Sequence, residues 1–208
     1  MTKINAPDYS NRLRKVDWEV RPAPLSDGQA LVAQHHYARG GSNTCVYMHG
    51  LYPLGGGALM GVAWWLPPTK VAAQSVDRRE WQRVLSLTRM VILPDVPQNA
   101  ASFLLSRSVK LIAAEGRFRS LVTYADEYMG HTGGVYKSAG WEYVGRTGPY
   151  VKWHTSEGRQ VAAKATRTRS KVEMLALGHT RVGSFHKHKY VKHLTNIQTL
   201  TITAEQEG

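Results

Sequence analysis

The 208-residue sequence has a single cysteine, Cys45, and no long run of hydrophobic residues. One cysteine excludes an internal disulfide bond and a cysteine-based zinc cluster, and it is typical of a protein that works in a reducing compartment. No segment is apolar over the length needed to cross a bilayer, and residues 1–15 lack the apolar core of a signal peptide. We therefore expect a soluble, cytoplasmic protein that makes no contact with a membrane.

Acidic side chains are also scarce, because 15 Asp and Glu residues face 27 Lys and Arg residues and leave a formal net charge of +12. The hydrophobic fraction of 42% argues against a disordered chain, and the length suffices for one domain with a real core. A pI near 10.0 in a compact chain of this size indicates a polyanionic partner.

The order of predicted elements indicates an α/β fold with a mixed central sheet flanked by helices. Between Leu87 and Trp153, an apolar strand leads through a Pro-broken loop into a helix over residues 100–115. A second strand then ends in Tyr124-Ala125-Asp126, and a Gly-punctuated helix and two further strands follow. Ligands bind beyond the carboxyl ends of strands in such sheets, so chemistry is expected at Asp126.

The segment before Leu87 reads as strands and one helix. Strands are predicted over residues 16–20, 44–52, 58–66 and 86–93, and a helix with Ser26 as its N-cap runs through Gln34. Trp64 and Trp65 are neighbours on one strand, so we expect one in the core and the other exposed.

The character of the chain changes after His154. Residues 155–193 hold nine Lys and Arg against two acidic residues, with His and aromatic residues interleaved. We therefore divide the chain into a core domain, residues 1–154, and a basic C-terminal segment, residues 155–208, which we expect to pack on or extend the core and to contact nucleic acid.

Several short motifs, taken in order, carry a resemblance to a known family. They are His35-His36-Tyr37, Leu87–Val91, Asn99–Ser108, Tyr124-Ala125-Asp126, Gly130–Gly133 with Tyr136, Gly140-Trp141 and Lys187–Tyr190. Over roughly residues 25–193 this order resembles the GNAT acyltransferase superfamily and, more closely, the bacteriophage Mom family of DNA adenine-modifying proteins.

The resemblance implies a GNAT-like fold with a basic C-terminal extension and a transferase activity. A small acyl-derived group, glycyl or acetamido, would pass to the exocyclic amine of adenine and give carbamoylmethyl-adenine. This would protect phage DNA from host restriction, in the cytoplasm of the infected cell if the protein is phage-encoded. The partner would be double-stranded DNA with a flipped adenine, because a stacked base cannot enter a cleft. The sequence leaves open whether the protein forms a homodimer.

The resemblance also implies four catalytic residues: His36, Tyr37, Asp126 and Tyr136. Asp126 would orient or deprotonate the amine, although its alternative role is to cap the following helix. His36 could instead cap a helix C-terminus, and Tyr136 could be a core residue on Trp141.

A metal site is a further expectation for this set of residues. His36 and Asp126, with His49 or His131 as an additional ligand, would make a two-His, one-carboxylate site for iron or zinc.

The predicted donor-binding residues are Arg89, Asn99 and Ser102. Acetyl-CoA-binding relatives cradle a pyrophosphate on a Gly-rich loop, whereas the corresponding loop here, residues 95–102, has no glycine. The donor is therefore open between an acyl-CoA and an aminoacyl-tRNA, in particular glycyl-tRNA. Arg89 interrupts an apolar strand face, and its alternative role is an ion pair with Glu80 or Asp95.

The predicted DNA-binding residues lie in the basic segment: Arg181, Lys187, Lys189, Tyr190 and Lys192. Their alternative is a solvated basic face. For the whole chain two rival functions stay open, an acetyl-CoA-dependent N-acetyltransferase acting on a protein or small amine, and a non-catalytic nucleic-acid-binding protein with a GNAT shell. The missing glycine loop counts against the first, and the set of candidate catalytic residues counts against the second.

Overall fold

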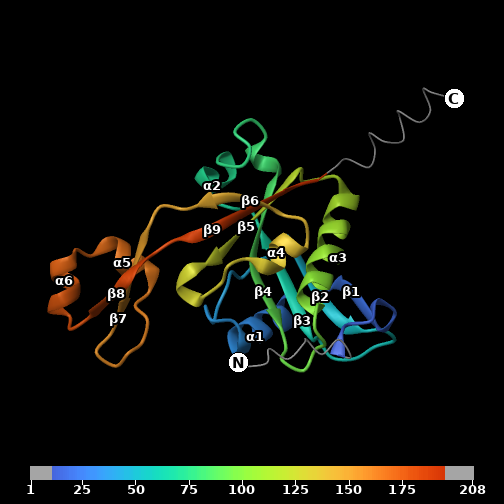
Figure 1. Ribbon diagram of the computed structural model, residues 1–208, viewed down its shortest axis with the longest axis horizontal. Helices are drawn as coiled ribbons and strands as arrows, with labels where there is room; N and C mark the ends of the chain where they lie inside the picture. The colour runs from blue at the N-terminus through green and yellow to red at the C-terminus, as the bar shows by residue number, and fades with distance from the viewer. Residues whose placement is uncertain (1–10, 195–208) are drawn as a thin grey trace, which may run out of the picture. The chain divides into compact units, whose positions relative to one another are not determined.

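The computed structural model describes residues 11–194, except for the side chains of residues 163 and 164. The described residues fall into two compact units (Figure 1). Within the described residues, unit 1 draws on residues 11–123, 135–142 and 191–194, and unit 2 consists of Tyr124–Gly134 and Tyr143–Tyr190. Each unit is assembled from separate segments of the chain, whereas the predicted division after residue 154 follows chain order.

A seven-stranded sheet runs in the order β1-β2-β3-β4-β5-β9-β6. Its strands are β1 (Trp18–Pro22), β2 (Tyr47–Pro53), β3 (Gly61–Leu66), β4 (Val84–Ile92), β5 (Ser120–Asp126), β9 (Lys187–His193) and β6 (Glu142–Arg146). Neighbours from β1 to β4 are antiparallel, and β4 pairs with β5 in parallel. A separate antiparallel pair joins β7 (Tyr150–His154) and β8 (Thr180–Phe185). The mixed sheet confirms the predicted architecture.

The helices are mostly short and connect the strands. They are α1 (Leu25–His35), α2 (Lys70–Gln74), α3 (Ala100–Glu115), α4 (Gly134–Ser138), α5 (Ala163–Thr168) and α6 (Lys171–Ala176). The helix predicted over residues 100–115 is confirmed at both ends. The predicted cap of α1 is wrong, because the helix begins at Leu25 after Pro24 and Ser26 lies within its first turn. There the Ser26 hydroxyl contacts Asp27 rather than a backbone amide.

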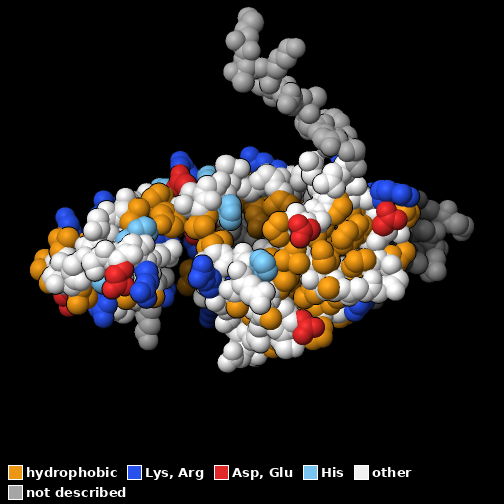
Figure 2. Space-filling model, turned by 90° about the horizontal axis from the view of Figure 1, so that it is seen from below, with side chains coloured by type: hydrophobic (Ala, Val, Ile, Leu, Met, Phe, Trp, Pro, Cys, Tyr) orange, Lys and Arg blue, Asp and Glu red, His pale blue; other side chains and the backbone are white. Residues whose placement is uncertain are grey.

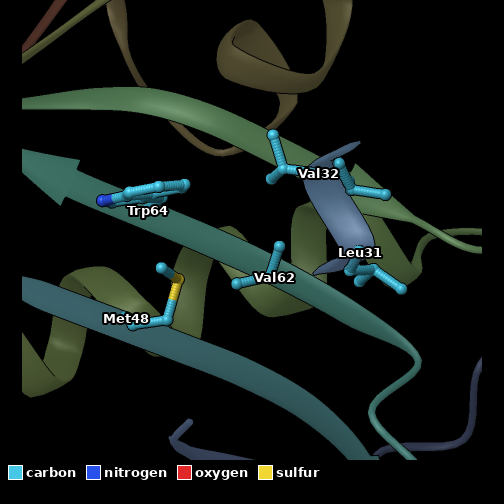
Figure 3. Close-up of a cluster of buried hydrophobic side chains, with 6 residues drawn as sticks. Leu31, Val32, Met48, Val62 and Trp64 are labelled. Atoms are coloured by element: carbon cyan, nitrogen blue, oxygen red, sulfur yellow. The ribbon is translucent and has the colours of Figure 1, made fainter. Parts of the chain in front are cut away.

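Side chains from both faces of β2 and β3 are buried in unit 1. Met48, Val62 and Trp64 pack against Leu31 and Val32 of α1 (Figure 3). The approach is close at Gly28 of α1, where an added Cβ would lie 2.6 Å from the sulfur of Met48.

The alternate residues of the same strands face α3. The Trp65 indole N–H donates to Ser108 Oγ of α3 over 2.7 Å, and His49 Nδ1 lies 2.6 Å from the same oxygen. The expectation that one of Trp64 and Trp65 is exposed is wrong: they are 1% and 0% exposed. Helices cover both faces of β3, so alternation directs the two side chains to two different cores.

The strand β4 contains an irregularity at its centre. Trp64 pairs with Arg89 while Trp65 pairs with Leu87, so Thr88 is an extra residue in the ladder. Parallel pairing between β4 and β5 covers Val84, Leu85 and Ser86, and beyond it the Thr123 hydroxyl donates to the Leu87 carbonyl over 3.2 Å. The ladder between the two central strands is therefore replaced by a side-chain contact as soon as the bulge is reached.

Burial of His49 makes stability depend on pH. Loss of water around the imidazole lowers the pKa of His49 from 6.5 to about 4. Between these values the unfolded chain takes up a proton that the folded chain refuses, so the free energy of unfolding should fall by about 3 kcal/mol as the pH drops from 6.5 to 4. Urea titrations across this range should show the decline, and His49→Gln should remove this part of it. An equal pH dependence in the variant would contradict the assignment.

Candidate active site

His36 and Tyr37 lie at the end of α1 in unit 1. The His36 backbone N–H donates to the Val32 carbonyl, and its Nδ1 accepts the Ala38 N–H over 3.1 Å. The rings of His36 and Tyr37 are 4.3 Å apart, and Tyr37 is 43% exposed. The turn thus holds an imidazole and an exposed phenol together.

The guanidinium of Arg89 supports the loop that follows this turn. It donates to the carbonyl oxygens of Gly40 over 3.0 Å and Thr88 over 2.7 Å. The alternative pairing with Glu80 is not formed, since Glu80 lies 3.2 Å from Arg119 and 3.6 Å from Arg83. Arg89 therefore joins the bulge of β4 to the loop beside Tyr37.

A pocket of about 330 Å³ opens along α3 in unit 1. The predicted donor-binding residues Asn99 and Ser102 both line it, together with the cations Lys15, Arg107 and Lys110. No carboxylate lines this pocket. Three cations and the amino end of a helix suit an anionic ligand.

The start of α3 is shaped by Asn99 in place of a glycine. Asn99 adopts φ 69°, a left-handed conformation that Asn tolerates better than other residues with a Cβ. Its side chain forms no cap, and the Ser102 hydroxyl donates to the Asn99 carbonyl over 2.9 Å. The helix end thus keeps the tight turn without the glycines of a CoA-binding loop.

Tyr136 of α4 packs against Trp141, as its alternative role as a core residue predicts. Its ring lies 5.9 Å from that of Trp141, which in turn stacks on Trp65 at 6.3 Å. Trp141 is 4% exposed, and its indole N–H has no partner among the described residues. Tyr136 contributes to this aromatic stack, and its catalytic role stays a prediction.

In unit 2, several polar and titratable side chains lie around Asp126. The Asp126 side chain is 4% exposed, and its Oδ1 accepts the Tyr128 N–H over 3.1 Å and a hydrogen bond from the Tyr150 hydroxyl. Asp126 does cap the short helix η4 (Glu127–Met129), as its alternative role predicts. The contact with Tyr150 is additional, so the carboxylate is held by more than a cap.

Cationic and aromatic side chains surround this carboxylate. The Lys152 ammonium lies 4.8 Å from the ring of Tyr128 and 5.5 Å from that of Tyr150. Burial lowers the pKa of Lys152, with Lys187 adding to the effect and Asp126 opposing it. The Tyr128 hydroxyl lies 2.8 Å from His154 Nε2. We call Asp126, Tyr128, Tyr150, Lys152 and His154 the Asp126 cluster.

Comparison with known proteins identifies the family. The Mom protein family model matches residues 17–206, which is most of the chain. This chain belongs to the Mom protein family. Membership implies modification of adenine in DNA, and no curated protein matches the sequence.

Solved structures similar to this Mom family protein share its fold. Arabidopsis thaliana NAA60, in complex with a bisubstrate analogue, matches with a TM-score of 0.52 and 11% identity, covering 86% of this chain and 99% of that one. Spermidine N-acetyltransferase from Vibrio cholerae, in complex with CoA and spermine, matches with a TM-score of 0.50 and 8% identity, covering 87% and 98%. The predicted GNAT-like fold is therefore confirmed.

Tyr150 and Lys152, which lie in the Asp126 cluster of this Mom family protein, are not among the residues that the sequence analysis predicts for the site. A signal was present, because Tyr150, Lys152 and His154 alternate with the apolar Val151 and Trp153 along β7. Period-two alternation puts the three polar side chains on one face of a strand. The sequence does not say that this face meets Asp126.

The predicted DNA-binding residues differ in how their side chains are placed. Tyr190 is 1% exposed and its hydroxyl donates to the Thr132 carbonyl over 2.7 Å, so stacking on a base would require it to leave this position. The Lys192 ammonium donates to the Ala139 and Gly140 carbonyls at the end of α4. Lys187 lies 5.5 Å from the Tyr150 ring, and burial lowers the pKa of Lys189. Arg181 is exposed.

The described part of this Mom family protein provides no set of ligands for the predicted metal site. No group of three or more His, Cys, Asp or Glu side chains is placed there to hold a metal ion. His49 instead contacts Ser108 in the core. Within residues 11–194, every helix is too short or too polar to span a membrane.

The Asp126–Tyr150 contact should be measurable as stability. Tyr150→Phe removes a hydrogen bond to a buried carboxylate, which should lower the free energy of unfolding by about 1.5–3 kcal/mol. Tyr143→Phe is the matched control, because Tyr143 is 44% exposed and its hydroxyl makes a long contact of 3.4 Å to His188. The control should change stability by less than about 0.5 kcal/mol. Equal effects in urea titrations of the two variants would contradict a specific role for Tyr150.

Proposed function

We propose that this protein transfers a small acyl-derived group to the exocyclic amine of adenine in DNA and yields carbamoylmethyl-adenine, which protects phage DNA from restriction. The observation that carries the proposal is the buried Asp126 carboxylate at the end of β5, bonded to Tyr150. Family membership supports adenine as the substrate.

Asp126 is the group that handles the amine proton in this proposal. A carboxylate within hydrogen-bond reach of an amine can take up its proton as the amine attacks. The Tyr128 amide and Tyr150 hydroxyl hold the carboxylate in one orientation. In unit 1, His36 and the exposed Tyr37 phenol remain proposed catalytic residues.

The pocket along α3 is proposed as the donor site. Lys15, Arg107 and Lys110 would hold a donor phosphate, with Asn99 and Ser102 at the helix end. An acyl-CoA carries the required anion in its phosphates, and an aminoacyl-tRNA carries it in the backbone phosphodiesters next to its aminoacylated 3′ end. Because residues 95–102 contain no glycine, we favour an aminoacyl-tRNA over an acyl-CoA as the donor.

A glycyl donor accounts for the atoms of the product without a separate amidation. The adenine amine attacks the glycyl ester carbon, the new C–N bond replaces the ester C–O bond, and the amine proton reaches the leaving hydroxyl through Asp126. The glycyl amine then attacks the ring carbon that carries the substituted amine, forming a five-membered spiro intermediate. Cleavage of the original bond from that carbon to nitrogen gives carbamoylmethyl-adenine, an isomer of glycyl-adenine.

Mass spectrometry of nucleosides tests the reaction directly. Plasmid DNA from bacteria expressing the full chain should contain deoxyadenosine with the mass of an added carbamoylmethyl group, and it should resist some restriction enzymes. Unmodified deoxyadenosine together with acetylation of a protein or amine would favour the rival N-acetyltransferase and overturn the proposal.

Substitution of Asp126 should abolish this product without unfolding the protein. Asn at position 126 keeps an oxygen that accepts from Tyr128 and Tyr150 but cannot take a proton, so modification should fall about 10²–10⁴-fold. His36→Ala should have an effect of the same order. Glu157→Gln is the control, since Glu157 is an exposed carboxylate of the same unit. Wild-type modification by Asp126→Asn would eliminate the proposed proton transfer.

Neutralising the pocket should affect the donor and not the DNA. Arg107→Gln with Lys110→Gln removes two cations, so modification should drop at least about 10–100-fold at limiting donor, because that is the loss expected for a single contact to a charged group. DNA affinity should stay unchanged. Arg78→Gln with Arg79→Gln removes the same charge at exposed positions away from the pocket and should leave modification intact. If the two double variants behave alike, the pocket does not hold the donor.

A further inference from the structure

Residues 147–186 form a closed insertion between β6 and β9, which we call the insertion module. Its two ends meet through Thr147, whose N–H donates to the Lys187 carbonyl over 2.9 Å and whose hydroxyl accepts the Lys187 N–H over 3.1 Å. His186 Nδ1 lies 2.7 Å from the Thr147 carbonyl. The chain therefore leaves the sheet and returns to it at one point.

The insertion module has its own packing. Trp153, Val161 and Met174 are buried together, and β7 pairs with β8 beside them. Ser170 and Glu173 form a reciprocal capping box at the start of α6. These contacts hold α6 in one orientation within the module. Its exposed side chains therefore project from a fixed helix.

The surface of the insertion module is basic and its acidic residues are already engaged. Glu157 lies 3.1 Å from Arg159, and Glu173 is held by the capping box. Exposed cations on or near α5, α6 and β8 are Arg167, Arg169, Lys171 and Arg181. Among the described residues, Arg167, Lys171 and Arg181 form no ion pair.

The same surface exposes aliphatic side chains. Val172 is 76% and Leu175 53% exposed, and their spacing of three places them on one side of α6. Leu177 just after the helix is 52% exposed, whereas Met174 is buried in the module core. In the part of the chain that holds α5 and α6, Figure 2 shows blue cationic and orange hydrophobic side chains next to one another. Neighbouring exposed aliphatic side chains that are bordered by polar residues mark an interaction surface.

We propose that the exposed face of α6 docks on duplex DNA, with Arg167, Lys171 and Arg181 on phosphates and Val172 and Leu175 wedged at a base step. Cations without counter-charges suit phosphates, and aliphatic wedges unstack a duplex that cations alone would leave closed. A second copy of the same basic face would be repelled by its charge. This inference rests on the proposed function, because unstacking is needed only if an adenine must leave the duplex to be modified.

The electrostatic part is tested by binding at several salt concentrations. For the full-length chain and a fluorescein-labelled duplex, Arg167→Gln with Lys171→Gln should flatten the slope of log affinity against log salt by about 1.8, at about 0.9 per lost phosphate contact. Arg78→Gln with Arg79→Gln carries the same charge change and should keep the wild-type slope. Equal slopes in all three proteins would overturn the proposal.

The wedge is tested with duplexes that report base unstacking. Wild type should raise the fluorescence of 2-aminopurine placed beside a target adenine, and Val172→Ser with Leu175→Ser should lose this rise while keeping the salt slope. A duplex that is already mismatched at that step should restore the affinity of the variant, because the opening is no longer required. The control Val71→Ser with Leu54→Ser removes two equally exposed aliphatic residues, 79% and 59%, from unit 1.

Two results would overturn the wedge. One is a normal 2-aminopurine signal in the α6 variant. The other is a wild-type dimer that becomes monomeric on Val172→Ser with Leu175→Ser in sedimentation, which would make this face a contact between copies. All readouts are independent of modification. Loss of the product with intact docking therefore contradicts the proposed function alone, and loss of docking in active protein contradicts this inference alone.

Discussion

The extra residue in β4 is the constraint on which much of unit 1 depends. Thr88 shifts the register against β3, and regular pairing with β5 stops just before it. Backbone groups that a continuous ladder would occupy are instead met by Thr123, and Arg89 is turned toward the loop after Tyr37. A bulge in a central strand re-aims side chains and ends pairing locally, which is the role it has here.

Helices cover the sheet on both faces, and this restricts the contacts that polar side chains of its strands can make. Alternate residues of β2 and β3 pack on α1 and α3, so the strands lie in a dry environment and every polar side chain needs a partner. His49, Trp65 and Ser108 satisfy one another, and Arg89 uses carbonyl oxygens. The amino end of α3 has no side-chain cap and lines a pocket with cations, an arrangement that suits an anion.

Much of the fold was predictable because it depends on local patterns. The amphipathic helix over residues 100–115 and the strand that ends at Asp126 follow from periodicity. The error at Trp64 and Trp65 arose because alternation was read as one buried and one solvated face, and the second helix layer is not visible in that segment.

The site was predictable only in part, for a related reason. Asp126 follows from its place at a strand end, but its partner Tyr150 comes from a strand outside the main sheet. Such a contact depends on how the chain returns, which no spacing encodes. Likewise Lys192 and Tyr190 look like ligand-binding residues in a basic stretch, whereas one donates to a helix end and the other is buried.

The closure of the insertion module at Thr147 and Lys187 has a consequence for the order of folding. The strand β9 lies between β5 and β6 in the sheet, yet it follows the module in the chain. Bringing β9 to its place across about 40 unfolded residues would cost about 3 kcal/mol of chain entropy. Once the module has folded, its ends are adjacent and most of that cost is gone. We therefore expect the central sheet to be completed after the insertion module has folded, so a variant that unfolds the module should slow folding of the whole chain.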